Sequence, residues 1–173
     1  MWPALEITAY ETAFVHADVE SSCAGGVQSN VAGWQMPVGA PPSPFTGVLP
    51  VATGDLVQAT VTYDLHLTYT LAVTDHTTGA GFAVRQKCTA GCNNDFAEVI
   101  TQRLPGGVPL ADFATLTFNG ITVSDYGAAA CRAGPMVRHG CWQTVGVTMV
   151  PANIHHAVPG PLIGNSFGNV WRP

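Results

Sequence analysis

The chain has 173 residues, of which 47% are hydrophobic and 10% are charged, and its net charge is −5. This length suits one domain over residues 1–173, and the composition is too apolar for a disordered chain. Only six residues are Lys or Arg, so no basic stripe exists to bind nucleic acid, and no run of about 18 apolar residues exists to span a membrane.

The chain starts with Met1-Trp2-Pro3, which lacks the basic and apolar segments of a secretory signal peptide. Residues 36–47 are rich in Pro and Gly and are expected to form a long loop. Long loops in a compact β-domain often line a binding site. A second long loop is expected over residues 125–142.

From residue 55 onward, polar and apolar residues alternate with a period of two, which is typical of half-buried strands. Asp64 is the expected turn between the first two strands, and residues 77–81 form the next turn. Asn119-Gly120 predicts a hairpin, because a type I′ turn needs a positive φ at both central positions. The predicted strands are 57–63, 65–73, 82–87, 97–103, 114–118, 121–124, 145–150 and 167–171.

Helices are not expected to contribute much. No segment keeps a period of 3.6 residues, and 13 Pro and 19 Gly oppose long helices. Many short strands at close spacing indicate an all-β, antiparallel sandwich or barrel with few or no helices.

Five cysteines occur in loop-like surroundings, which favours disulfides formed in an oxidising compartment. A zinc site at the close pair Cys88 and Cys92 is the alternative, but no second close pair completes a set of four ligands. The odd number leaves one thiol unpaired or a partner outside this chain. The five are Cys23, Cys88, Cys92, Cys131 and Cys141.

Glu98 is the main candidate for chemistry. It lies in the apolar run Phe96-Ala97-Glu98-Val99-Ile100, where low polarity would favour the neutral carboxyl and suit a general acid/base. The alternative is an ordinary strand Glu on a solvated face, since Glu is seldom buried without a partner.

An ordered set of motifs around Glu98 resembles the glutamic peptidase family, the eqolisins. The likeness extends over nearly the whole chain and is strongest over residues 54–120. Each motif alone is weak, and the ordered set is specific. The segments that resemble the family are Gly54-Asp55 before a long strand, Val73-Thr74-Asp75 with Thr77-Thr78-Gly79, Cys88, Ala97-Glu98, and Pro109-Leu110-Ala111-Asp112-Phe113.

The resemblance assigns the catalytic acid/base to Glu98 and exposes a substitution at the family's second catalytic position. Counting from Trp2 places Glu6 at a family Asp and His16 at the catalytic Gln. Phe14-Val15-His16-Ala17-Asp18 is similar to a family strand of the type Val-Glu-Gln-Ala-Gly. By resemblance Trp2, Glu6 and Trp34 would lie near the substrate groove, although core packing is the default for Trp34.

The resemblance implies a sandwich of two curved sheets, of the concanavalin or jelly-roll type, that lacks the first strands of the family domain. It implies a secreted, monomeric, acid-acting endopeptidase whose partner is a polypeptide substrate and which needs no cofactor or metal. In the family Glu activates a water molecule and Gln donates a hydrogen bond to the oxyanion, a donor worth roughly 3 kcal/mol. With His16 in that position, activity is expected to be reduced or lost.

Two further interpretations remain open. The chain could be a non-catalytic module that keeps the groove and binds peptide or glycan. It could also be an incomplete gene product without function, because missing strands leave unpaired sheet edges.

Overall fold

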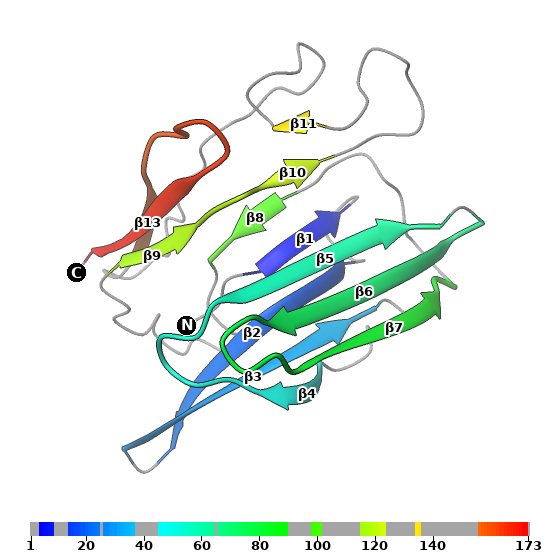
Figure 1. Cartoon of the computed structure of the whole chain (residues 1–173), viewed down its shortest axis with the longest axis horizontal. Helices are drawn as coiled ribbons and strands as arrows, with labels where there is room; N and C mark the ends of the chain where they lie inside the picture. Colours follow the sequence, from blue (N-terminus) through cyan, green and yellow to red (C-terminus); the bar gives the residue numbers. More distant parts are fainter. Residues whose placement is uncertain are drawn as a thin grey trace. The chain divides into compact units, whose positions relative to one another are not determined.

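The computed structural model describes residues 4–8, 14–24, 26–36, 45–64, 66–89, 98–101, 115–123, 134–135 and 156–172. Within these ranges every regular element is a β-strand, and no helix is long and apolar enough to cross a membrane. The chain forms two compact units, Met1–Thr101 and Gln102–Pro173 (Figure 1). The expected single domain over residues 1–173 stays a prediction.

The first unit contains a five-stranded antiparallel sheet with the strand order β4-β3-β2-β1-β8. Its long central strand β2 alternates Val15, Ala17 and Val19 with His16 and Asp18, so the two sets lie on opposite faces. Both sets are buried. The strands are β1 (Ala4–Thr8), β2 (Phe14–Ala24), β3 (Val27–Gln35), β4 (Thr46–Pro50) and β8 (Glu98–Ile100).

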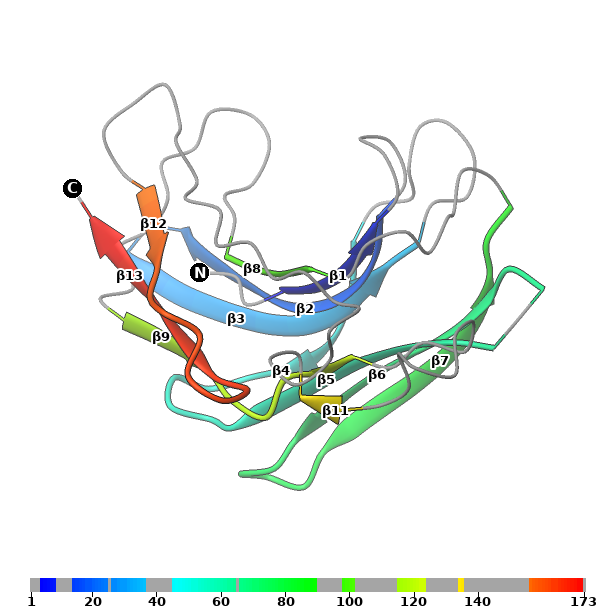
Figure 2. The same ribbon diagram turned by 90° about the horizontal axis from the view of Figure 1, so that it is seen from above.

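A second antiparallel sheet of the first unit consists of β5 (Val57–Tyr63), β6 (Thr68–Asp75) and β7 (Gly81–Lys87). One face of it is exposed and the other is buried, which is why its sequence alternates so regularly. The core joins the two sheets, and Figure 2 shows that β2 and β3 are curved with their concave side turned away from β5–β7. The buried core residues are Val15, Ala17, Val19, Ala32, Met36, Tyr69, Leu71, Val73 and Cys88.

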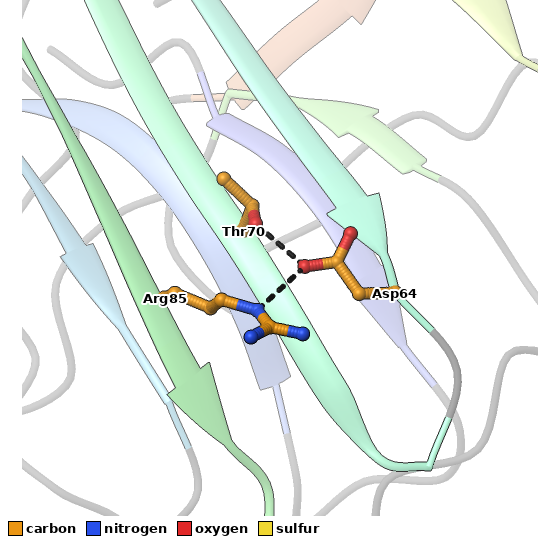
Figure 3. Close-up of polar contacts among 3 residues, drawn as sticks. All are labelled: Asp64, Thr70 and Arg85. Atoms are coloured by element: carbon orange, nitrogen blue, oxygen red, sulfur yellow. Dashed lines mark hydrogen bonds and ion pairs between the residues drawn. The ribbon is translucent and has the colours of Figure 1, made fainter.

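The connection between β5 and β6 is longer than predicted. The second strand was expected from residue 65 but begins at Thr68, because His66 and Leu67 have φ values of 51° and 60° and leave the extended region. Asp64 forms hydrogen bonds to β6 and β7 at this end of the sheet (Figure 3). Its Oδ2 accepts a hydrogen bond from Thr70 Oγ1 at 2.7 Å and one from Arg85 Nε at 3.1 Å, and these partners hold the pKa of Asp64 below its ordinary value.

The turn predicted over residues 77–81 is present and is organised by Asp75. Its carboxylate is buried and accepts hydrogen bonds from the Thr77 N–H at 2.8 Å and the Thr78 hydroxyl at 2.7 Å. These bonds, the Thr78 hydroxyl first, lower the pKa of Asp75. A side chain that bonds to the backbone two residues ahead is the usual way in which Asp fixes a turn.

In the second unit, β9 (Thr115–Phe118), β12 (His156–Pro159) and β13 (Phe167–Arg172) form a sheet in the order β12-β13-β9. A two-stranded ladder joins β10 (Thr122–Val123) to β11 (Gly134–Pro135). All the ladders described in either unit are antiparallel.

The hairpin predicted at Asn119-Gly120 is wrong. β9 pairs with β13, and Figure 1 shows β10 continuing the direction of β9. Gly120 has the positive φ that the turn signal implies, 65°, but Ile121 N–H donates to the Asn165 carbonyl at 3.0 Å. Pairing with the distant strand β13, including stacked Phe118 and Phe167 rings 4.9 Å apart, therefore overrides the local preference.

Gly33 allows β4 to approach β3. A Cβ built at Gly33 would collide with the Thr46 carbonyl oxygen and with the ring of Phe45. The pairing of β3 with β4 shifts its register between Ala32 and Gly33. Only a residue without a side chain fits this contact.

Gly33→Ala is expected to lower the free energy of unfolding by about 1–3 kcal/mol, because the collision involves backbone and cannot be relieved by a rotamer change. Urea unfolding followed by circular dichroism measures this. The matched control is Gly168→Ala, also within a strand, where the nearest atom would lie at an ordinary 3.7 Å. Equal losses in both variants would contradict the close-approach explanation.

Candidate active site

Four residues from four neighbouring strands form one row across the five-stranded sheet. Glu98 in β8 is the register partner of Glu6 in β1, Glu6 is the partner of His16 in β2, and His16 is the partner of Gln35 in β3. Directly paired residues of antiparallel strands share a face. The row therefore lies on the concave face, opposite the buried Val15, Ala17 and Val19.

β1 separates the strands of the two predicted catalytic residues. Neighbouring Cα atoms in such pairs lie about 4.5–5.5 Å apart, so Glu98 and His16 are about 10 Å apart across Glu6. This register puts Glu6 between the two predicted catalytic residues. It also places two carboxylate residues, Glu6 and Glu98, directly beside each other.

His16 and Asp18 lie two residues apart on the same face of β2 and contact each other. His16 Nε2 is 3.6 Å from Asp18 Oδ2, which is an electrostatic contact longer than a hydrogen bond. His16 is 5% exposed and Asp18 is 1% exposed. Among the residues that the structure describes, none hydrogen-bonds to His16 Nδ1, which is also buried.

Burial lowers the pKa of His16 from its ordinary 6.5 to about 4. The nearby Asp18 carboxylate favours the charged imidazolium, but desolvation of an almost fully buried ring dominates over a contact of this length. His16 is therefore neutral in mildly acidic solution, and its ring becomes charged only below about pH 4.

The five strands of this sheet contain acidic residues but neither Lys nor Arg. Glu20 lies on the same face of β2, beyond Asp18, and burial raises its pKa. His16 is thus the one side chain in these strands that can become positive, and Glu6, Asp18, Glu20 and Glu98 share its face. In the described part of the chain, no three His, Cys, Asp or Glu side chains are grouped to hold a metal ion.

The predicted site residues that the structure describes lie on two different faces of the five-stranded sheet. Glu98, Glu6 and His16 come together in the row. Trp34 is the partner of Ala17 and packs against the core, on the other face of the sheet. Residue parity is the reason, since Trp34 precedes Gln35 by one position. This position agrees with core packing and not with a place in the groove. Trp2 lies outside the described residues.

One residue of the row, Gln35, and one beside it, Asp18, were not predicted from the sequence as site residues. Asp18 follows His16 by two positions, and the alternation of Val15, Ala17 and Val19 with these polar residues would have placed both on one face. Gln35, which is half-buried, depends on the register of the β2–β3 hairpin. That register requires knowing the turn near Gly26, whose φ is 81°.

The family model of the peptidase A4 family matches residues 1–138 of the chain. The chain is also similar to the crystal structure of aspergilloglutamic peptidase from Aspergillus niger, with a TM-score of 0.72 and 18% sequence identity. That match covers 98% of this chain and 96% of the other. It confirms the expected antiparallel β-sandwich fold. No curated protein matches the sequence.

Proposed function

Because the chain belongs to the peptidase A4 family, we propose that it is a glutamic-type endopeptidase that hydrolyses polypeptides in acid. The row on the concave face supports this proposal most strongly, since it aligns Glu98, Glu6 and His16 in one register. A water molecule is the nucleophile, and the reaction requires no cofactor.

Glu98 is the general acid/base in this proposal. Its carboxylate takes a proton from water as the water oxygen attacks the scissile carbonyl, and the carboxyl then gives this proton to the leaving amine. His16, on the other side of Glu6, faces the developing oxyanion. Glu6, in β1 between β2 and β8, and Trp2 are the proposed substrate-binding residues, as the family resemblance implies.

Activity is expected to be low because of His16. A side-chain amide donates a hydrogen bond at any pH, whereas a neutral imidazole has a single N–H that can point elsewhere. The low pKa of His16, about 4, restricts a second donor to strong acid. Losing one oxyanion donor costs about a hundredfold to a thousandfold in rate.

Secretion belongs to the same proposal. Cys88 is buried and disulfide-bonded, and such bonds persist in oxidising compartments. The low charge, 10% of residues, is consistent with an acidic extracellular environment, where many carboxylates would be neutral. We propose a monomer.

A second function is favoured by the burial of the site. His16 is only 5% exposed, so a substrate reaches its ring only after a local rearrangement. A module that binds peptide or glycan without cleaving it fits a buried and chemically altered row.

Incubation of an unfolded polypeptide with the full chain, from about pH 2 to about pH 7, tests the proposal. Mass spectrometry of the products is expected to show new peptide termini below about pH 4. Retention of the intact polypeptide on the immobilised chain, without new termini, would instead establish the binding module. If the polypeptide is neither cleaved nor retained, both functions are contradicted.

A further inference from the structure

His16 and Asp18 are a joint departure from the strand pattern that this segment resembles. That pattern has Gln and, two residues later, Gly, whereas this chain has His16 and Asp18. The structure brings the two substituted side chains into contact, with Nε2 of His16 3.6 Å from Oδ2 of Asp18. The two side chains therefore form one feature of this strand.

The sheet provides space for the added carboxylate of Asp18. Its register partners are Gly33 on β3 and Ala4 on β1, both small residues. Phe45 contacts the position that a Gly33 side chain would take. Asp18 is 1% exposed, and a buried carboxylate is costly unless it interacts with a donor or a positive charge.

The two nitrogens of His16 differ in their surroundings. Nε2 faces the Asp18 carboxylate, and Nδ1 is buried without a hydrogen-bond partner among the described residues. A neutral imidazole carries one proton, and a nearby carboxylate oxygen draws that proton to the nitrogen it faces. The bare lone pair is then on Nδ1, which makes that nitrogen an acceptor.

We propose that Asp18 is a positioning residue for His16, and that its carboxylate holds the neutral imidazole as the tautomer protonated at Nε2. Nδ1 then donates a hydrogen bond only after the ring has bound a second proton. This inference rests on the proposed function in assigning the oxyanion to His16. It makes the oxyanion donor of the site dependent on acid.

The other titratable positions on this face are acidic. Glu6 adjoins His16 from β1, Glu98 lies beyond it on β8, and Glu20 is on β2. The β3 partner, Gln35, does not titrate. All three are acidic residues, and a nearby carboxylate favours the imidazolium, so burial of His16 and not these residues confines its formation to low pH.

NMR of the full chain with nitrogen-labelled histidine tests the tautomer directly and without activity. At about pH 6 the His16 ring is expected to be protonated at Nε2 and bare at Nδ1. The His16→Gln spectrum identifies its signals. Asp18→Asn, which keeps the side-chain volume, is expected to move the titration midpoint of His16 further below about 4, because it removes the negative charge. Asp18→Ala is expected to increase the tautomer protonated at Nδ1.

Two controls separate a positioning role from general damage. His76 Nε2 lies 2.8 Å from Gln58 Oε1, and its signals should be unchanged in both Asp18 variants, which shows that the fold is kept. Glu20→Gln removes a carboxylate from the same face without touching His16 and should leave its tautomer unaltered. If Asp18→Ala does not fold, the proposal is still tested by the His16 titration midpoint in Asp18→Asn and by the tautomer in the wild-type spectrum.

The proposal is overturned if the wild-type ring is protonated at Nδ1 at about pH 6, as it would be with a neutral Asp18 donating to Nε2. It is also overturned if His16 has the same titration midpoint in Asp18→Asn as in the wild type. The proposed function fails separately, if the predicted tautomer is present but no peptide bond is cleaved. In an active enzyme, kcat/KM should rise about a hundredfold as the pH falls through the His16 midpoint, and His16→Gln should abolish that rise.

Discussion

Glu98→Gln is expected to lower kcat/KM for an unfolded polypeptide by about a hundredfold to ten-thousandfold in acid. Gln has nearly the size of Glu and keeps hydrogen-bonding capacity, but its amide cannot exchange a proton with water or with the leaving amine. The measurement is the initial rate of peptide release at about pH 3. If the wild-type rate is too low to compare, the same substitution is made in His16→Gln, which supplies an amide donor.

The matched control for Glu98→Gln is Glu20→Gln. Both residues belong to the same five-stranded sheet, and Glu20 shares a face with His16 but lies outside the row. Glu20→Gln is therefore expected to keep the wild-type rate. An unchanged rate in Glu98→Gln, or an equal loss in both variants, would remove Glu98 from the role of acid/base.

The second large effect concerns stability. The folded chain has a His16 pKa of about 4 and the unfolded chain has the ordinary 6.5, so between these pH values the unfolded state binds a proton that the folded state does not. The stability associated with neutral His16 is fully present above pH 6.5 and is lost as the pH falls to about 4. Each pH unit of this window is worth about 1.4 kcal/mol, which gives about 3 kcal/mol in all.

Urea unfolding at about pH 7 and about pH 4 measures this linkage. The wild type is expected to lose about 3 kcal/mol more than His16→Gln between the two conditions, because Gln does not titrate. His76→Gln, which replaces an exposed histidine, serves as the control and should follow the wild type. Parallel losses in the wild type and His16→Gln would show that burial of His16 does not control acid stability.

The sequence predicted best the strands with one exposed face. β5, β6 and β7 were found by alternation alone, since each places every second residue in the core. β2 was recognised only through the family resemblance, although it alternates as regularly. The alternation of Val15, Ala17 and Val19 with His16 and Asp18 is visible in the sequence, but the prediction from alternation began only at residue 55.

Long-range pairing explains what the sequence could not predict. The Asn119-Gly120 signal describes four residues, whereas the partner of β9 begins at Phe167. The same applies to the site, because the row of Glu98, Glu6 and His16 depends on β8 joining β1 across about 90 intervening residues, a closure that no local pattern encodes. Trp34 was expected near the substrate groove by resemblance but packs against the core. A shift of one position reverses the face of a strand residue.

Strand β1 has a consequence for how the site tolerates change. β2 and β8 are not neighbours, and each is aligned to the other only through its own ladder with the short segment Ala4–Thr8. This segment acts as a spacer, so deleting or inserting one residue in it would turn Glu6 to the opposite face and shift Glu98 against His16. The alignment of the row is therefore more sensitive to the length of β1 than to most of its side chains.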